Sequence, residues 1–214
     1  MLKKSVLLCF LLIGLTGCES AYYSAWEKVG VHKRDIMVDR IEDVRESQQD
    51  VKEQFSSALE RFTAELNFDG GELEAIYKAL NDEYENSRSE ADTLSKRIDA
   101  VEGVAEALFD EWQVELDQYS SASLKRQSAA QLKQTRRQYA QMLSAMHNAE
   151  RKMEPVLSTL QDQVLFLKHN LNARAIASLK TEFKGLKKDI QRLIGDMENS
   201  IKAADTFLAT LKQS

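Results

Sequence analysis

The residue with the clearest chemistry in this chain is a cysteine, Cys18, which ends a short apolar stretch near the N-terminus. Two lysines open the chain, an almost wholly apolar run from Val6 to Leu15 follows, and Thr16 and Gly17 come directly before the cysteine. A positive start, an apolar segment and small residues before a cleavage point are typical of a secretory signal. The run is shorter than the roughly 20 apolar residues that a membrane-spanning helix needs. The sequence therefore predicts export and removal of residues 1–17.

The same residues specify a covalent modification. Leu15-Thr16-Gly17-Cys18 resembles the lipobox of bacterial lipoproteins, an aliphatic residue and two small ones before a cysteine. The resemblance implies lipidation of the sulfur and amino group of Cys18 with chains such as palmitate, and residues 18–25 then form a lipidated tether. An aspartate after the cysteine favours the inner membrane in such lipoproteins, whereas Glu19 and Ser20 follow here, so we expect the outer membrane, facing the periplasm. The alternative is an ordinary signal that happens to end near a cysteine.

Other reactive groups give little sign of catalysis. Cys9 lies in the signal, so the mature chain keeps one cysteine and has no disulfide pair. No glycine precedes a lysine, which excludes the P-loop of nucleotide hydrolases. His147 and Glu150 share a helix face and could contribute to a metal site, but a solvated pair is the commoner arrangement. We therefore predict no catalytic residue, no metal, no cofactor and no nucleotide, and we expect that the protein is not an enzyme.

Composition predicts that the elements around these groups are helices. The chain has one proline and eight glycines in 214 residues, and 29% of its residues are charged. Loss of the two lysines of the signal takes the formal net charge from −5 to −7. That charge disfavours binding to nucleic acid and unaided adhesion to anionic lipid.

Apolar residues recur in steps of three and four along four successive segments, which indicates long amphipathic helices and no sheet. The first seam runs from Ile41 to Phe62, with Gln48 at its one polar position. The second runs from Leu73 to Tyr119, the third from Leu132 to Leu171 and the fourth from Ile176 to Leu211, including Ile201. Met142, Met146 and Met153 fall on core positions of the third seam, so we interpret them as packing residues.

Three breaks divide the seams. Asp69-Gly70-Gly71 is the clearest turn, residues 120–123 offer serine N-caps, and residues 169–172 contain two asparagines. We predict an all-α fold, an elongated antiparallel bundle of about four long coiled-coil-like helices at 26–67, 72–118, 123–169 and 172–212 within a single domain, 26–214. Pro155 leaves an alternative open. It either kinks a continuous third helix, which the unbroken apolar phase favours, or starts a new one.

Charges around the second turn are segregated. The charged residues of 106–117 are all acids, whereas those from Lys125 to Arg137 are all basic. Each block opposes the helix dipole near its own helix end, at a cost of about 0.3 to 1 kcal/mol for each charge. A hairpin at 119–123 would pair the two blocks and offset that cost. The alternative is a basic stripe that binds an acidic partner or lipid headgroups, formed by Lys125, Arg126, Lys133, Arg136 and Arg137.

As a whole, the chain resembles a family of Gram-negative lipoproteins known only as a domain of unknown function. The resemblance is carried by Glu27–Val38 and Gln163–Ile176 and covers nearly all of the mature chain. Members have carried an automatic label as DNA-repair ATPases. The absence of a P-loop and the presence of a lipobox both speak against that label. The resemblance implies a helical lipoprotein and assigns no catalytic residue.

These features lead to two functional hypotheses. The first is a non-enzymatic structural, scaffold or adaptor lipoprotein of the cell envelope, with an envelope protein partner or self-association. The second is a bundle that binds a lipid, metal or small hydrophobic ligand between its helices. Two polar segments, His32–Asp35 and Lys168–Asn170, are either interaction sites or ordinary helix ends.

Overall fold

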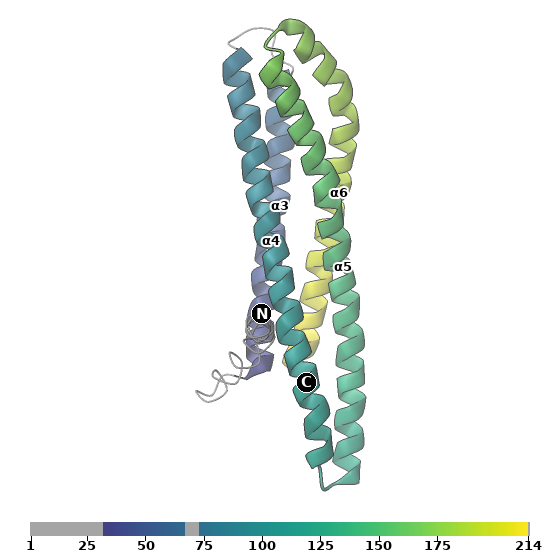
Figure 1. Ribbon diagram of the computed structural model, residues 1–214. Coiled ribbons are helices and arrows are strands. Elements are labelled where there is room, and N and C mark those ends of the chain that lie inside the picture. Colours follow the sequence, from purple (N-terminus) through teal and green to yellow (C-terminus); the bar gives the residue numbers. More distant parts are fainter. Residues whose placement is uncertain (1–31, 67–72, 214) are drawn as a thin grey trace, which may run out of the picture.

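The computed structural model describes residues 32–66 and 73–213. Over these residues the chain forms four long α-helices: α3 (Lys33–Leu66), α4 (Leu73–Glu115), α5 (Ala122–His169) and α6 (Ala173–Gln213). A single 3₁₀ turn, η1 (Leu116–Gln118), extends α4, and no strand occurs among the described residues. Successive helices run in opposite directions along one elongated bundle (Figure 1). The predicted all-α antiparallel bundle is confirmed.

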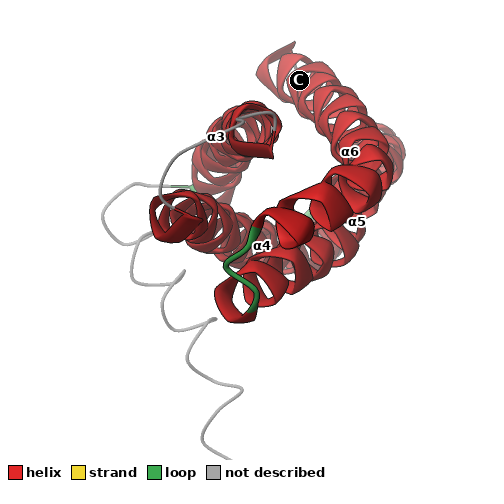
Figure 2. Ribbon diagram, turned by 90° about the horizontal axis from the view of Figure 1, so that it is seen from above, coloured by secondary structure: helices red, strands yellow, loops and turns green. Residues whose placement is uncertain are grey.

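The four helices form a ring in which each packs against two neighbours. α3 contacts α4 and α6, and α5 contacts the same two helices, so α3 and α5 lie across the bundle from each other. Figure 2 shows this arrangement along the bundle axis. The apolar seams meet on the inside of the ring. All the apolar residues of the first seam are buried there, and so are Gln48 and the three methionines of the third.

The predicted boundaries agree with the structure to within a few residues, except at the first helix. α3 begins at Lys33, whereas the prediction placed the helix from residue 26; residues 26–31 lie outside the described part of the chain, and His32 is not helical. Backbone amides of Asp35 and Ile36 donate to the His32 carbonyl oxygen at 2.9 and 3.2 Å. His32 therefore supplies the first carbonyl acceptor of the helix.

Helix ends elsewhere follow the predicted capping residues. Ser121 accepts a hydrogen bond from the Leu124 amide and starts α5, while the Asn172 side chain accepts from the Ala175 amide and starts α6. The predicted Asp-Gly-Gly turn lies at residues 69–71, outside the described residues. α5 passes through Pro155 without a break, which confirms the continuous helix and excludes a new helix start at that proline.

Three seam residues were assigned wrongly. Tyr119 and Leu171 are exposed because each lies in a turn at one end of the bundle, beyond the last layer that can cover it. Ile201 is only half-buried, and the core position belongs to Ser200, which is fully buried. The Gln48 amide donates a 2.6 Å hydrogen bond to the Ser200 hydroxyl, so a small polar residue faces the buried glutamine.

The helices differ in length more than predicted, which leaves a projection at one end. α3 has 34 residues, α4 has 43, α5 has 48 and α6 has 41. Lys33, at the start of α3, pairs with Glu111 of α4, and α4 continues past that level to the turn before α5. The α4–α5 hairpin therefore extends beyond the start of α3, as the lower part of Figure 1 shows.

A buried glutamine in α5 provides a test of the core. Gln163 is 4% exposed, and neither its amide nitrogen nor its amide oxygen has a hydrogen-bond partner among the described residues. Replacing a buried unpaired amide by an apolar group of similar size removes a desolvation cost. We expect Gln163→Leu to raise the free energy of unfolding by about 1 to 2 kcal/mol in urea titrations. The exposed Gln127→Leu should change it by less than about 0.5 kcal/mol; a loss of stability in Gln163→Leu would contradict this account.

Candidate interaction surfaces

The residue with the strongest predicted role, Cys18, lies outside the described residues. The first described segment after it is the polar stretch His32–Asp35. Lys33 is buried and its ammonium group contacts the Glu111 carboxylate of α4 at 3.0 Å. The Arg34 guanidinium donates to the backbone carbonyl of Leu211 in α6. These polar groups join the first turn of α3 to both neighbouring helices. Of the two alternatives for this segment, the contacts favour a helix end with a structural role.

Charges at the α4–α5 hairpin pair as the segregated blocks predict. Lys125 contacts Asp117 at 2.9 Å, and Arg136 approaches Asp110 at 4.0 Å while donating to the backbone carbonyl of Phe109 at 3.1 Å. The hairpin interpretation is confirmed for these two cations. Arg126, Lys133 and Arg137 make no ion pair within the described part of the chain and are exposed.

An aromatic cluster lies between α4, α5 and α6 near the base of the hairpin. Tyr139 of α5 meets Phe109 of α4 edge-on, with ring centroids 5.4 Å apart, and contacts Phe207 of α6 at 6.1 Å. The Arg136 guanidinium lies 5.5 Å above the Phe109 ring in a cation–π contact. The cluster therefore ties α4, α5 and α6 together at this level.

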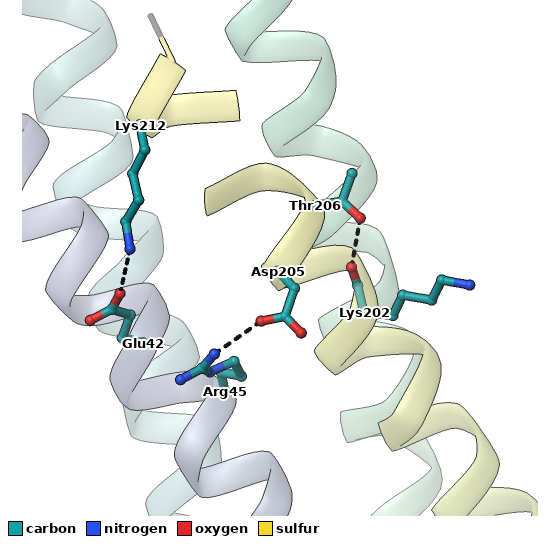
Figure 3. Close-up of polar contacts among 6 residues, drawn as sticks. All are labelled: Glu42, Arg45, Lys202, Asp205, Thr206 and Lys212. Atoms are coloured by element: carbon teal, nitrogen blue, oxygen red, sulfur yellow. Dashed lines mark hydrogen bonds and ion pairs between the residues drawn. The ribbon is translucent and has the colours of Figure 1, made fainter. Parts of the chain in front are cut away.

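An acidic groove of about 910 Å³ runs along α3 beside α6. Its lining contains one cation, Arg45, and six carboxylates, from Asp39, Glu42, Asp43, Glu46, Asp50 and Asp205. Arg45 contacts Asp205 at 3.1 Å, and Lys212 contacts Glu42 at 3.2 Å; Figure 3 shows both pairs bridging the two helices. The remaining carboxylates give this face of α3 a negative surface.

His147 lies between two carboxylates from different helices. Its Nε2 atom is 2.7 Å from Glu102 of α4, and its Nδ1 atom is 2.8 Å from Glu150 on its own helix. The sequence placed His147 and Glu150 on one helix face and so predicted their contact, but it did not predict the contact with Glu102. An imidazole can donate to both carboxylates only when both ring nitrogens carry a hydrogen. Within the described residues no group of three histidine, cysteine, aspartate or glutamate side chains is arranged to hold a metal ion.

The turn between α5 and α6 satisfies backbone groups. The Asn170 side-chain amide donates to the Phe166 carbonyl at 2.9 Å, and the Asn170 backbone amide donates to the Leu167 carbonyl at 3.1 Å. The Lys168–Asn170 segment is therefore a helix end of the ordinary kind. Large apolar side chains are nevertheless exposed around it, namely Leu165, Phe166 and Leu171.

The opposite end of the bundle carries its own exposed apolar residues and a small cavity. Tyr119 and Leu124 are exposed at the hairpin turn, and Val114 is exposed on α4. A cavity of about 200 Å³ lies at the base of the hairpin, lined in part by Leu108, Trp112 and Leu211. None of the described helices is apolar over a length that could cross a bilayer.

Comparison with known proteins places this architecture in a family without assigning it an activity. Residues 22–211 match the family described as Protein of unknown function (DUF2959). The chain belongs to this family. No curated protein and no solved structure matches the chain. The family match starts at residue 22, eleven residues before α3, so the family domain includes the segment that leads into the bundle.

The aromatic cluster leads to a pH-dependent prediction. Burial raises the pKa of the Tyr139 hydroxyl above its ordinary value of 10.0, and the carboxylates of Glu102 and Glu106 raise it further. The phenol therefore ionises first in the unfolded chain as the pH rises. Its contribution to stability is complete below about pH 10 and is lost progressively above it.

We expect Tyr139→Phe to lessen the alkaline loss of stability. A single such group contributes a slope of up to about 1.4 kcal/mol per pH unit above pH 10, and the phenylalanine variant lacks it. Urea unfolding at a series of pH values from about 9 to about 12 measures the slope, with Tyr119→Phe as a control that removes a phenol from the surface. Identical slopes for Tyr139→Phe and the parent chain would show that burial of this hydroxyl has no such effect.

Proposed function

We propose that the protein is a lipid-anchored, non-enzymatic adaptor or spacer of the Gram-negative cell envelope, held through Cys18 in the outer membrane and facing the periplasm. The observation that carries the proposal is the lipobox-like run that ends at this cysteine. A cysteine at the cleavage point of a signal, rather than elsewhere in the chain, is where lipidation occurs.

The shape of the bundle supports a role in spanning distance. α3 begins at the end where the α4–α5 hairpin projects, so the chain that carries Cys18 joins the bundle at that end. At 1.5 Å per residue, α3 extends for about 50 Å and α5 for about 70 Å. An anchor at the start of α3 would hold the α5–α6 turn tens of ångströms away from the bilayer.

The far end has the chemistry of a contact surface. Leu165, Phe166 and Leu171 are exposed there, at 45%, 40% and 46%. Exposed apolar side chains that gather at one place are more informative than the same residues scattered singly over a surface. We assign the partner-binding role of the adaptor to this end.

A ligand-binding bundle is the second candidate. The lining of the cavity of about 200 Å³ at the base of the hairpin combines apolar side chains with polar ones such as Glu115 and Thr135. It is smaller than the roughly 300 to 1,000 Å³ of most small-molecule sites, and the larger groove beside α6 is lined mainly by carboxylates rather than by apolar side chains. The adaptor role is therefore preferred, and native mass spectrometry of the purified protein would reveal bound material if the second candidate held.

The anchor is tested by localisation. We expect the parent protein to sediment with outer membranes on a density gradient and to incorporate labelled palmitate. The Cys18→Ala variant should do neither, because the acyl chains have no attachment site, whereas Cys9→Ala should behave like the parent since that residue is removed with the signal. Palmitate label retained in the Cys18→Ala variant would disprove lipidation at this residue.

The adaptor role is tested by crosslinking in intact envelopes followed by purification of the protein. We expect a reproducible partner that is lost from the double variant Leu165→Ser, Phe166→Ser, because the substitutions remove the apolar surface at the far end. Val114→Ser removes an even more exposed apolar group at the other end and should leave the partner in place. Recovery of nothing above background from the parent protein would overturn the role.

A further inference from the structure

The first half of α5 presents a helix face that nothing in the described chain covers. From Ala122 to Ala149 the helix contains no acidic residue and five lysines or arginines. Lys125 and Arg136 pair with acids of α4, as described above. Arg126, Lys133 and Arg137 do not, and all three are exposed. Spacings of seven and four place them in one row, the basic face of α5.

The complement of this row lies on α3 of the same chain. Asp39, Asp43, Glu46 and Asp50 follow one another in steps of four, three and four, so they also form one row, the acidic face of α3. Each is exposed or half-exposed. Of the cations near them, Arg40 lies 4.0 Å from Asp43, and Arg45 pairs with Asp205 of α6. α3 and α5 lie across the ring from each other, so the two rows are carried by helices on opposite sides of the bundle.

The two faces also lie at the same height along the bundle. Arg45 of α3 contacts Asp205 of α6, and Tyr139 of α5 contacts Phe207 of α6. Since α6 runs against both helices, Asp43 lies level with Phe207 and therefore with Tyr139. By the same count Asp39 lies level with Thr135. Lys133 and Arg137 are each two residues below these levels, an offset of about 3 Å.

We propose that the basic face of α5 binds the acidic face of α3 in a second copy of this protein, with Lys133 facing Asp39 and Arg137 facing Asp43. α3 and α5 run in the same direction, so this register joins copies that stand side by side with the same end down. That arrangement rests on the proposed anchor, which would orient every copy alike in one membrane. The contact uses a different surface on each partner, so it leads to open rows rather than a closed dimer.

We expect the contact to be weak because it consists of exposed ion pairs. Exposed ion pairs contribute little individually and are screened by salt. Confinement to one membrane raises the effective concentration of neighbouring copies, so a weak contact suffices there. In solution we expect association at high protein concentration and low salt, and dissociation as the ionic strength rises.

Charge reversal tests the pairing directly. We expect sedimentation velocity of the full chain in mild detergent to show oligomers at about 20 mM salt and monomers at about 500 mM. Lys133→Glu with Arg137→Glu, and separately Asp39→Lys with Asp43→Lys, should each abolish association. Mixing these two variants should restore it, because each then supplies the face that the other lacks. Lys184→Glu with Lys188→Glu reverses a matched, exposed pair on α6 and should change nothing.

Each other outcome overturns the proposal. A parent chain that stays monomeric at low salt excludes the contact, and it leaves the lipid anchor untouched, because localisation is measured separately. Association that survives either reversal, or that mixing does not restore, places the contact on other surfaces. A monomeric parent chain whose basic face binds vesicles containing phosphatidylglycerol, with loss of binding in Lys133→Glu, Arg137→Glu, would assign that face to lipid. Circular dichroism of each variant is the control for folding.

Discussion

Burial of one apolar stripe on each helix is the interaction on which the whole structure depends. A single helix of 34 to 48 residues has no partner for its stripe in water, and the ring arrangement gives each helix two. Large side chains such as Phe55, Phe62 and Leu160 are fully enclosed as a result. Ion pairs such as Arg88–Glu154 lie on the exposed outside and contribute little beside this burial.

Polar residues inside the stripe restrict how the helices align. Gln48 is fully buried and donates to Ser200, so sliding α3 against α6 by one turn would leave both groups without a partner. An apolar stripe alone tolerates such a displacement, since each apolar side chain then packs in the place of a similar one. Arg97 has a similar effect between α4 and α3, because its guanidinium donates to the Asp43 carbonyl at 2.8 Å. These few contacts fix the heights at which charged surface residues stand.

The steps of three and four in the sequence predicted the helices and most of the core, since burial of a helix face leaves that pattern directly. The pattern did not distinguish Ile201 from Ser200, because a step of four from Met197 reaches the first and a step of three reaches the second. The buried position is the one that faces Gln48 on another helix. Contacts between residues of different helices could not be predicted from the sequence either. His147 and Glu150 are neighbours in sequence, but Glu102 reaches the same imidazole only through the packing of α4 on α5.

Unequal helix lengths give the two ends of the bundle different properties. The end where α3 begins carries the polar contacts of Lys33 and Arg34 and the projecting hairpin, with its paired charges. Both ends expose apolar side chains, but those of the far end lie on and beside a short capped turn, without the segregated charges of the hairpin. A rod whose ends differ in this way can hold one kind of surface near an anchor and present another at a distance. Along its sides, the acidic face of α3 and the basic face of α5 stay exposed, because the apolar packing that holds the helices together lies inside the ring.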